Sequence, residues 1–243
     1  INSKILNDIA YQNLAVDLTG KTLGETTPSL SFDQRPMLSK IAGAETYSGI
    51  YALSNTSRGY TYNLSLTGKR SFDFGLDIMA SYTYMKSKAH NNGTSSVAQS
   101  NWQYNYTFGN PNSDELANSS FNIPHSIRVS AFYTKKWKAN QATTVGLIYN
   151  GSSGISYCVC YNGDLNGDTG YNDLIYIPTD TEAYQMNFTA TSSYTSEQQR
   201  ENFKAWLASD DYMKKHRGEY FKRNVDNEKF EHHFDLHLSC LLY

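Results

Sequence analysis

The chain has 243 residues, of which 39% are hydrophobic, and its formal net charge is −2. This charge offers no electrostatic attraction for nucleic acid, and no stretch approaches the ~20 apolar residues of a transmembrane helix. The 20 Tyr, 11 Phe and 3 Trp residues exclude a disordered chain, which would lack aromatic rings. A polar but tyrosine-rich composition is typical of a β-barrel, in which half of each strand faces water and aromatic girdles line the rims.

Apolar and polar residues alternate over several segments, and this alternation predicts β-strands. The expected strands, in chain order, cover residues 5–14, 49–54, 60–69, 76–85, 127–137, 143–150 and 234–239. The first two are the weakest. Short turns at 72–75 and 138–141 join their neighbouring strands into two β-hairpins.

The connections between these strands are uneven in length. Some turns take about four residues, whereas the segments 90–124 and 162–229 are long, and this asymmetry is typical of bacterial outer-membrane barrels. The alternative is a soluble β-sandwich, whose strands also alternate but are usually ~5–6 residues long. The longest alternating runs here have 10 to 11 residues. We therefore predict an all-β, antiparallel transmembrane β-barrel fragment over residues 1–243, with about seven long strands and long extracellular loops.

One helix is expected within the second long loop, near residues 196–217. Thr195 and Gln198 have the spacing of a capping box, with Thr195 as the N-cap residue. Apolar residues then recur near one helical face, and Gly218 follows as a stop signal. We expect this helix to pack over neighbouring loops.

The segment 163–173 carries the clearest local motif. Oxygen-bearing side chains stand at Asp164, Asn166, Asp168, Asn172 and Asp173. The first three alternate as in a calcium-binding loop, and the last two could complete the ligand set for a structural Ca²⁺. The motif departs from an EF-hand because Thr169 replaces the glycine and Ile175 replaces the bidentate glutamate. The alternative is an Asp/Asn/Gly turn that satisfies its own backbone.

Catalytic signals are weak, and we expect no enzyme. The chain contains no nucleophile, metalloprotease or phosphate-loop motif. His232 and His233 are adjacent and point to opposite faces of a strand, and Cys158 and Cys160 are poorly placed for a mutual disulfide. The candidate ligand-binding residues are instead aromatic rings expected to be exposed in the loops, which would suit sugars or peptides. They are Trp102, Tyr104, Tyr106 and Trp206.

A series of short motifs resembles the barrel of Oar-like TonB-dependent receptors, a Bacteroidetes-type family with a carboxypeptidase-regulatory-like domain. Their order and spacing, from about Asn13 to Leu238, carry the resemblance. They are Gln99–Trp102, Gly109–Asn112, Phe121–Arg128, Gly163–Asp168, Asn172–Pro178, Arg217–Tyr220 and Arg223–Asn224.

The resemblance implies a place in the Gram-negative outer membrane and import of a nutrient such as an oligosaccharide, a peptide or a metal chelate. Its partners would be outer-membrane lipid and the TonB–ExbB–ExbD complex, with a surface lipoprotein as a further candidate and no nucleic acid. The sequence contains no plug domain, TonB box or signal peptide, so we expect it to be the C-terminal part of a 22-stranded receptor barrel.

Two other interpretations compete with a transporter fragment. One is an independent adhesin or small structural barrel, and the other is a soluble calcium-binding β-domain or carbohydrate-binding module. In the soluble domain, the apolar strand faces would pack into a closed core. In a barrel wall, they would form an outward band about 25 Å tall.

Overall fold

The computed structural model describes residues 8–113, 115–137 and 141–241. The chain, predicted as one domain, forms two compact units. Unit 1 comprises Ile1–Gly59, Ala89–Ala117 and Tyr157–Asp226, and unit 2 comprises Tyr60–Lys88, Asn118–Ser156 and Asn227–Tyr243. The fold is predominantly β, as the alternation predicted.

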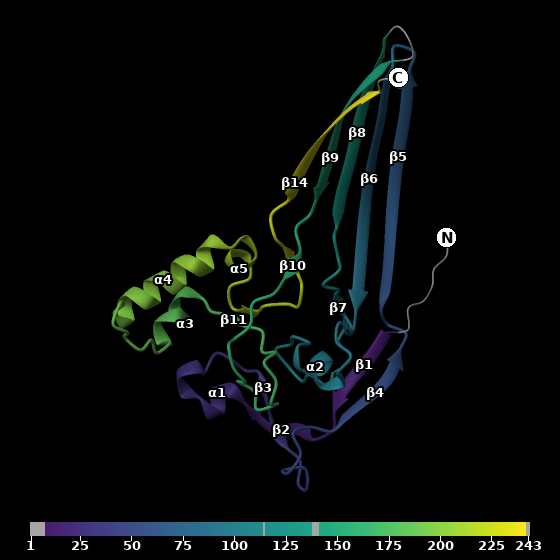
Figure 1. The fold of residues 1–243 in the computed structure, drawn as a ribbon. Coiled ribbons are helices and arrows are strands. Elements are labelled where there is room, and N and C mark those ends of the chain that lie inside the picture. Colours follow the sequence, from purple (N-terminus) through teal and green to yellow (C-terminus); the bar gives the residue numbers. More distant parts are fainter. Residues whose placement is uncertain (1–7, 114, 138–140, 242–243) are drawn as a thin grey trace. The chain divides into compact units, whose positions relative to one another are not determined.

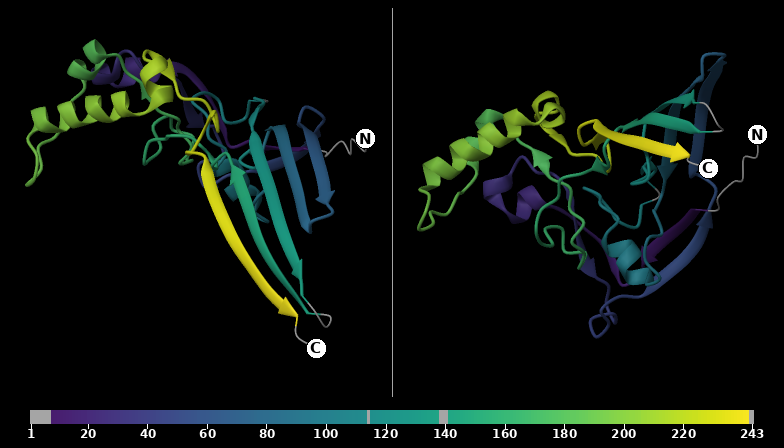
Figure 2. Two further views of the ribbon diagram at one scale, coloured as in Figure 1. Left: turned by 90° about the horizontal axis from the view of Figure 1, so that it is seen from above. Right: turned by 45° about the horizontal axis from the view of Figure 1, so that its top comes forward.

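Unit 2 contains the long strands, which lie side by side in one antiparallel sheet (Figures 1 and 2). They are β5 (Tyr60–Phe72), β6 (Leu76–Ala89), β8 (His125–Lys136), β9 (Ala142–Ser152) and β14 (Glu231–Leu241). The spatial order is β14-β9-β8-β6-β5, so β5 and β14 are the two edges. Both predicted hairpins are confirmed, with β5 paired to β6 and β8 paired to β9. Of the second turn, residues 138–140 lie outside the described residues.

The strand register aligns the apolar residues in rows on one face. One row runs from Gly68 through Ala80, Val129 and Tyr149 to Phe234, and the next runs from Arg70 through Ile78, Ala131 and Leu147 to Leu236. Because side chains alternate along each strand, residues of one row share a face. We call this surface the apolar face.

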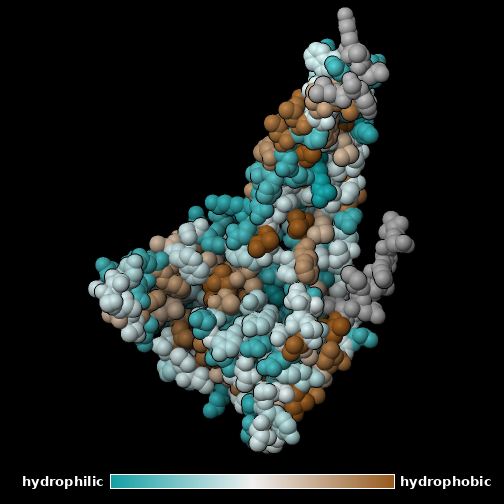
Figure 3. Space-filling view, viewed as in Figure 1, coloured by the Kyte–Doolittle hydropathy of each residue, from teal (hydrophilic) through white to brown (hydrophobic). Residues whose placement is uncertain are grey.

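No second layer covers the apolar face among the described residues of unit 2. Leu64, Leu66, Leu236 and Leu238 are between 71% and 78% exposed, and every buried hydrophobic residue of the described chain belongs to unit 1. In the space-filling view, hydrophobic side chains (brown) accordingly lie on the visible surface of the long strands (Figure 3). The sheet therefore has no hydrophobic core of its own.

The opposite face is mainly polar, and pairs of hydroxyl side chains form hydrogen bonds across neighbouring strands. Ser65 bonds to Thr83 at 2.8 Å, and Thr67 bonds to Ser81 at 3.0 Å. Phe132 lies on this face, which explains why it broke the predicted alternation. The two faces therefore differ sharply in polarity.

Unit 1 consists of short elements. Its strands are β1 (Asp8–Asn13), β2 (Val16–Thr22), β3 (Pro36–Lys40), β4 (Tyr51–Thr56), β11 (Tyr176–Ile177) and β12 (Glu219–Tyr220). They form the antiparallel pairs β1-β4, β2-β3 and β11-β12. Its helices are α1 (Leu23–Thr26), a 3-10 turn (Pro28–Leu30), α2 (Ala98–Gln103), α3 (Asp180–Gln185), α4 (Ser196–Ser209) and α5 (Asp211–Lys215). Two-residue strands stand where the chain passes between units: β7 (Ala117–Asn118), β10 (Ser156–Tyr157) and β13 (Asp226–Asn227).

Unlike unit 2, unit 1 has buried apolar clusters. The larger contains Leu174, Ile175, Ile177, Leu207, Met213 and Phe221. The smaller contains Tyr11, Val16, Leu38 and Trp102. In the described part of the chain, no helix is long and apolar enough to span a membrane.

Three expectations need correction. Five strands are long rather than about seven, because β1 and β4, at the two weakest predicted positions, have six residues each and pair separately. The predicted helix begins after Thr195 with the expected capping box, but it ends at Ser209. Asp210 leaves helical geometry and accepts a hydrogen bond from the Met213 N–H at 2.8 Å, which starts α5. The loops also hold several short helices, where one helix was expected.

The β5–β6 turn provides a test of the hairpin geometry. Gly75 has φ +95°, and a Cβ there would collide with the Thr134 carbonyl oxygen. We therefore expect Gly75→Ala to lower the free energy of unfolding by about 1–3 kcal/mol. Gly68→Ala is the matched control, since that site is in regular strand with open space around it. Urea titration of both variants in detergent measures the difference, and equal effects would contradict this geometry.

Candidate functional site

Asp164 organises the start of the predicted calcium loop. Its carboxylate accepts hydrogen bonds from the backbone N–H groups of Gly167 at 2.8 Å, Asp168 at 3.2 Å and Thr169 at 2.9 Å. Thr169 has φ +71°, so it adopts the left-handed conformation that glycine usually takes at this point of an EF-hand. Asp164 is exposed and serves the turn itself.

Asp168 and Asn166 are both fully buried beneath this turn. The Asn166 side chain accepts from the Asp168 N–H at 3.0 Å, and its Nδ2 donates to Asp168 Oδ2 at 3.2 Å. Burial raises the pKa of Asp168 to about 6, and the charges of Asp173 and Asp164 act in the same direction. Asn166 therefore hydrogen-bonds to a carboxyl group whose ionised form is disfavoured by burial.

Asn172 is the one residue of the motif whose side chain makes no hydrogen bond to the described residues. It is fully buried, and neither its Nδ2 nor its Oδ1 has a hydrogen-bond partner within the described residues. A Cβ at position 170 would lie 2.5 Å from Asn172 Nδ2 and 2.7 Å from Asp168 Oδ1, so both groups flank the same point beside Gly170. An unsatisfied buried polar group costs about 1–3 kcal/mol.

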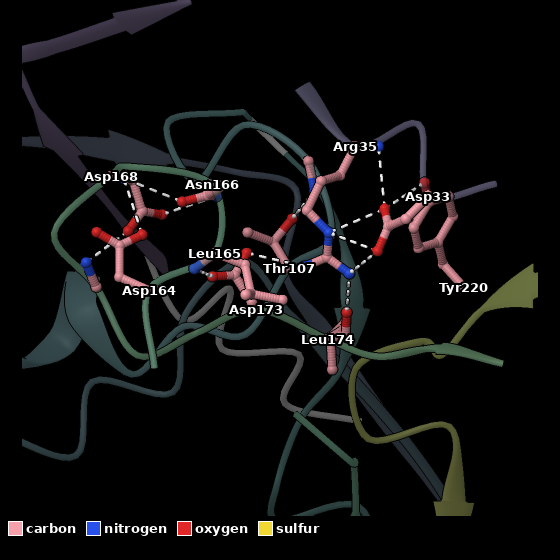
Figure 4. Close-up of polar contacts among 12 residues, drawn as sticks. Asp33, Arg35, Thr107, Asp164, Leu165, Asn166, Asp168, Asp173, Leu174 and Tyr220 are labelled. Atoms are coloured by element: carbon pink, nitrogen blue, oxygen red, sulfur yellow. Dashed lines mark hydrogen bonds and ion pairs between the residues drawn. The ribbon is translucent and has the colours of Figure 1, made fainter. Parts of the chain in front are cut away.

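Asp173 belongs to a different arrangement, a buried cluster around Arg35 (Figure 4). Arg35 has no exposed side-chain surface and pairs with Asp33 at 2.9 Å and with Asp173 at 3.0 Å. Its Nη2 also donates to the Leu174 carbonyl oxygen at 2.8 Å, and Tyr220 donates to Asp33 at 2.9 Å. We call this set the Arg35 cluster.

The second oxygen of Asp173 accepts the Leu165 N–H at 2.8 Å, which links the Arg35 cluster to the loop. Burial keeps the pKa of Asp173 above its ordinary value, although the Leu165 N–H and Arg35 both lower it. Four carboxylates, those of Asp33, Asp164, Asp168 and Asp173, thus stand against the single guanidinium of Arg35. When all are ionised, the five groups sum to a charge of −3.

The structure distributes the five predicted metal ligands among different tasks. Asp164 accepts backbone N–H groups of the turn, Asn166 hydrogen-bonds to Asp168, and Asp173 pairs with Arg35. Only Asp168 and Asn172 lie together beside Gly170, and of these two the Asn172 amide has no hydrogen-bond partner among the described residues. Among the described residues, no three His, Cys, Asp or Glu side chains are placed to share a metal ion.

The four aromatic candidates do not form one exposed surface. Trp102 was expected to be exposed, but it is 1% exposed, and its Nε1 donates to Asn112 Oδ1 at 3.0 Å. The expectation that Trp102 is exposed is therefore wrong, because the ring packs in the smaller cluster. Tyr104 and Trp206 are 59% and 41% exposed, whereas Tyr106 is half-buried against the larger cluster.

The apolar face of unit 2 is the second candidate site. Along β6, the eight residue steps from Leu76 to Tyr84, at about 3.4 Å each, span roughly 27 Å. Tyrosine–histidine pairs occupy one end, with Tyr82 bonded to His125 at 2.7 Å and Tyr149 bonded to His232 at 2.9 Å. The other end carries Phe72, Phe74, Tyr133 and Trp137. Aromatic rings therefore bound the aliphatic rows at both ends.

The adjacent histidines of β14 and the three cysteines are the other reactive side chains noted in the sequence. The register places His232 opposite Gly151 and His233 opposite Asn150, so the two rings lie on opposite faces, as predicted. Cys158, Cys160 and Cys240 are all free thiols. Burial raises the pKa of Cys158 to about 11, which disfavours the reactive thiolate.

No protein-family model matches the chain, and no curated protein or solved structure shows significant similarity to it.

The Arg35 cluster yields a stability prediction. Arg35→Met would leave Asp33 and Asp173 buried without their cation, and we expect it to lower the free energy of unfolding by about 3–5 kcal/mol. Glu201→Gln is the control, because Glu201 is exposed and its pair with Lys204 lies at the surface, where ion pairs add little stability. Urea unfolding followed by tryptophan fluorescence measures both, and a loss below about 1 kcal/mol for Arg35→Met would contradict the proposed importance of the cluster.

Proposed function

We propose that this chain is part of the barrel wall and folded loops of a TonB-dependent outer-membrane receptor that imports a nutrient. One observation carries the proposal: the five long strands of unit 2 form a sheet that exposes a continuous apolar face and that has no hydrophobic core among the described residues. A soluble sheet buries such a face against a second layer. Hydrocarbon is the solvent in which this face is stable without one.

The dimensions of the apolar face suit a bilayer. Outer-membrane barrels have an apolar band about 25 Å tall, flanked by aromatic girdles, and their strands need ~9–11 residues to cross. The strands of unit 2 have 11 to 14 residues, and aromatic rings stand at both ends of the aliphatic rows. The hydroxyl-rich opposite face is suited to a water-filled or plugged lumen.

The open edges support a larger assembly. Among the residues that the structure describes, β5 and β14 each have a neighbouring strand on one side only, so each leaves a row of backbone groups without a strand partner. In lipid, such groups must be paired by further strands, which closes the wall. Five long strands are too few for a receptor barrel, so the remaining wall, the plug and the contact with TonB–ExbB–ExbD would come from other parts of the same protein.

The loop structure in unit 1 would then serve ligand capture. Long loops of such receptors lie on the extracellular side, and exposed rings such as Tyr104 and Trp206 suit oligosaccharides or peptides. A surface lipoprotein is a further candidate partner. The alternative of a soluble β-domain requires residues such as Leu64 and Leu236 to be covered, and both are more than 70% exposed.

Charge insertion tests which face meets lipid. Leu66 and Thr67 are adjacent in β5 and point to opposite faces. We expect Leu66→Arg to reduce folding into phospholipid vesicles by about 2–4 kcal/mol near the bilayer centre, and Thr67→Arg to have little effect. Protease protection after mixing with vesicles measures insertion. Equal insertion of the two variants into vesicles would contradict the proposed orientation of the sheet.

Gene context tests the receptor assignment separately from the membrane assignment. Sequencing the coding region upstream of this segment should reveal, in frame, a plug domain and a carboxypeptidase-regulatory-like domain. A plug supports import and excludes an independent adhesin. An upstream region that encodes no plug would overturn the receptor assignment, even if the sheet inserts into vesicles.

A further inference from the structure

We propose that Asp168 and Asn172 bind one calcium ion between their buried side chains, next to Gly170. This inference concerns unit 1 alone and does not depend on membrane insertion of unit 2. It also differs from an EF-hand, because two side chains contact the ion and the other motif residues shape or charge the pocket. Water and backbone carbonyl oxygens would complete the coordination.

The unpartnered amide of Asn172 is the first reason. Buried amide groups in proteins are almost always hydrogen-bonded, yet both polar atoms of Asn172 lack a partner among the described residues. A half turn of the amide exchanges its oxygen with Nδ2, which lies beside Gly170 as Asp168 Oδ1 does. The amide oxygen and Asp168 Oδ1, which accepts the Gly170 N–H, would then be neighbours, an arrangement that a cation stabilises.

The negative charge around this point is the second reason. Asp168 is buried, and the carboxylates of Asp164 and Asp173 add to the potential at its side chain. The nearby guanidinium is already paired with Asp33 and Asp173. A bound divalent cation supplies the missing positive charge, and carboxylate and amide oxygens are the hard ligands that Ca²⁺ prefers.

The close approach of Gly170 to both groups is the third reason. A Cβ at this position would lie 2.5 Å from Asn172 Nδ2 and 2.7 Å from Asp168 Oδ1, so only glycine lets the backbone pass this close to the two side chains. Tyr51 is near enough to Asp168 for that charge to act with burial in raising the pKa of the tyrosine. The Tyr51 ring is therefore the expected reporter of a bound ion.

Calcium titration of the full chain in detergent, after removal of metal by chelation, tests the proposal. Calorimetry should give a Kd on the order of 10⁻⁴ M, typical of sites with few charged ligands. Saturating Ca²⁺ should raise the midpoint of thermal unfolding by about 5 °C or more. Tb³⁺ should bind with luminescence sensitised by the neighbouring aromatic rings and should be displaced by Ca²⁺. Absence of a calcium effect in both assays overturns the proposal.

Three variants distinguish this site from a water-filled pocket and from an EF-hand-like site. Asn172→Leu and Asp168→Asn should each weaken binding by about tenfold or more, since each removes a ligand or its charge. Asn172→Leu should leave the calcium-free chain at least as stable as the parent, because an unsatisfied amide is removed. Asp164→Asn should weaken binding less than Asp168→Asn does, because Asp164 contributes charge and caps the turn without contacting the ion. Glu201→Gln, at an exposed position of α4 away from the motif, is the matched control and should leave binding unchanged.

Two results would contradict the assignment of ligands. If Asn172→Leu destabilises the calcium-free chain and calcium has no effect on the parent, the amide is satisfied by buried water instead. If Asp164→Asn abolishes binding as completely as Asp168→Asn, the ion occupies an EF-hand-like position nearer the start of the loop. Neither result bears on vesicle insertion of the sheet, so failure here is distinguishable from failure of the proposed membrane role.

Discussion

A sheet one layer thick must satisfy two faces with different surroundings, and this constraint governs unit 2. Its strands pair through a complete antiparallel ladder, so the backbone of the interior strands is satisfied within the sheet. The side chains of the apolar face, in contrast, are not buried against other described residues of unit 2. Burial of apolar surface normally contributes ~25 cal/mol per Å², and the described residues of unit 2 contribute none of it through a closed core. The surroundings must therefore supply this stabilisation, which is the physical reason for our proposal that the sheet lies in lipid.

Unit 1 solves the opposite problem, because it folds polar segments that lie far apart in the sequence. Arg35 connects residue 33 to residues 173 and 174, and Tyr220 reaches the same carboxylate. Such a buried network is expensive to desolvate and adds stability only when every member is paired. Its geometric demands favour one arrangement of the loops over others. We infer that the Arg35 cluster specifies the loop fold more than it stabilises it.

The alternation of residues made the long strands predictable, because the period of two survives wherever a sheet has unlike faces. The capping box at Thr195 likewise located the start of α4. The same box at Thr179 and Glu182 starts α3, a signal that was present in the sequence but was not used. The break at Asp210 was harder to foresee, since an apolar helical face continues across it to Met213.

The site was only partly predictable for a different physical reason. Spacing identified the oxygen-rich loop, but it could not show that Asp173 pairs with Arg35, 138 residues away. It also could not show that Trp102 is held by Asn112, which in turn donates to the Asn13 carbonyl oxygen at 2.9 Å. The motifs that resemble the receptor family thus include contacts that build the loop fold. Local sequence reports which groups are available, and tertiary contacts decide which remain free.

The connection between β9 and β14 has a consequence for the order of folding. These neighbours pair from Ser152 with Glu231 onward, although the longest segment of unit 1, Tyr157–Asp226, lies between them in the sequence. Hairpins β5–β6 and β8–β9 have local contacts and low contact order, so they can form early. Docking of β14 must wait until the chain beyond residue 230 has been synthesised. Loop-closure entropy grows only slowly with length, at about 0.6 kcal/mol per doubling. The intervening segment can therefore lengthen or diverge at little thermodynamic cost, while the rate at which β14 joins the sheet depends on how quickly that segment becomes compact.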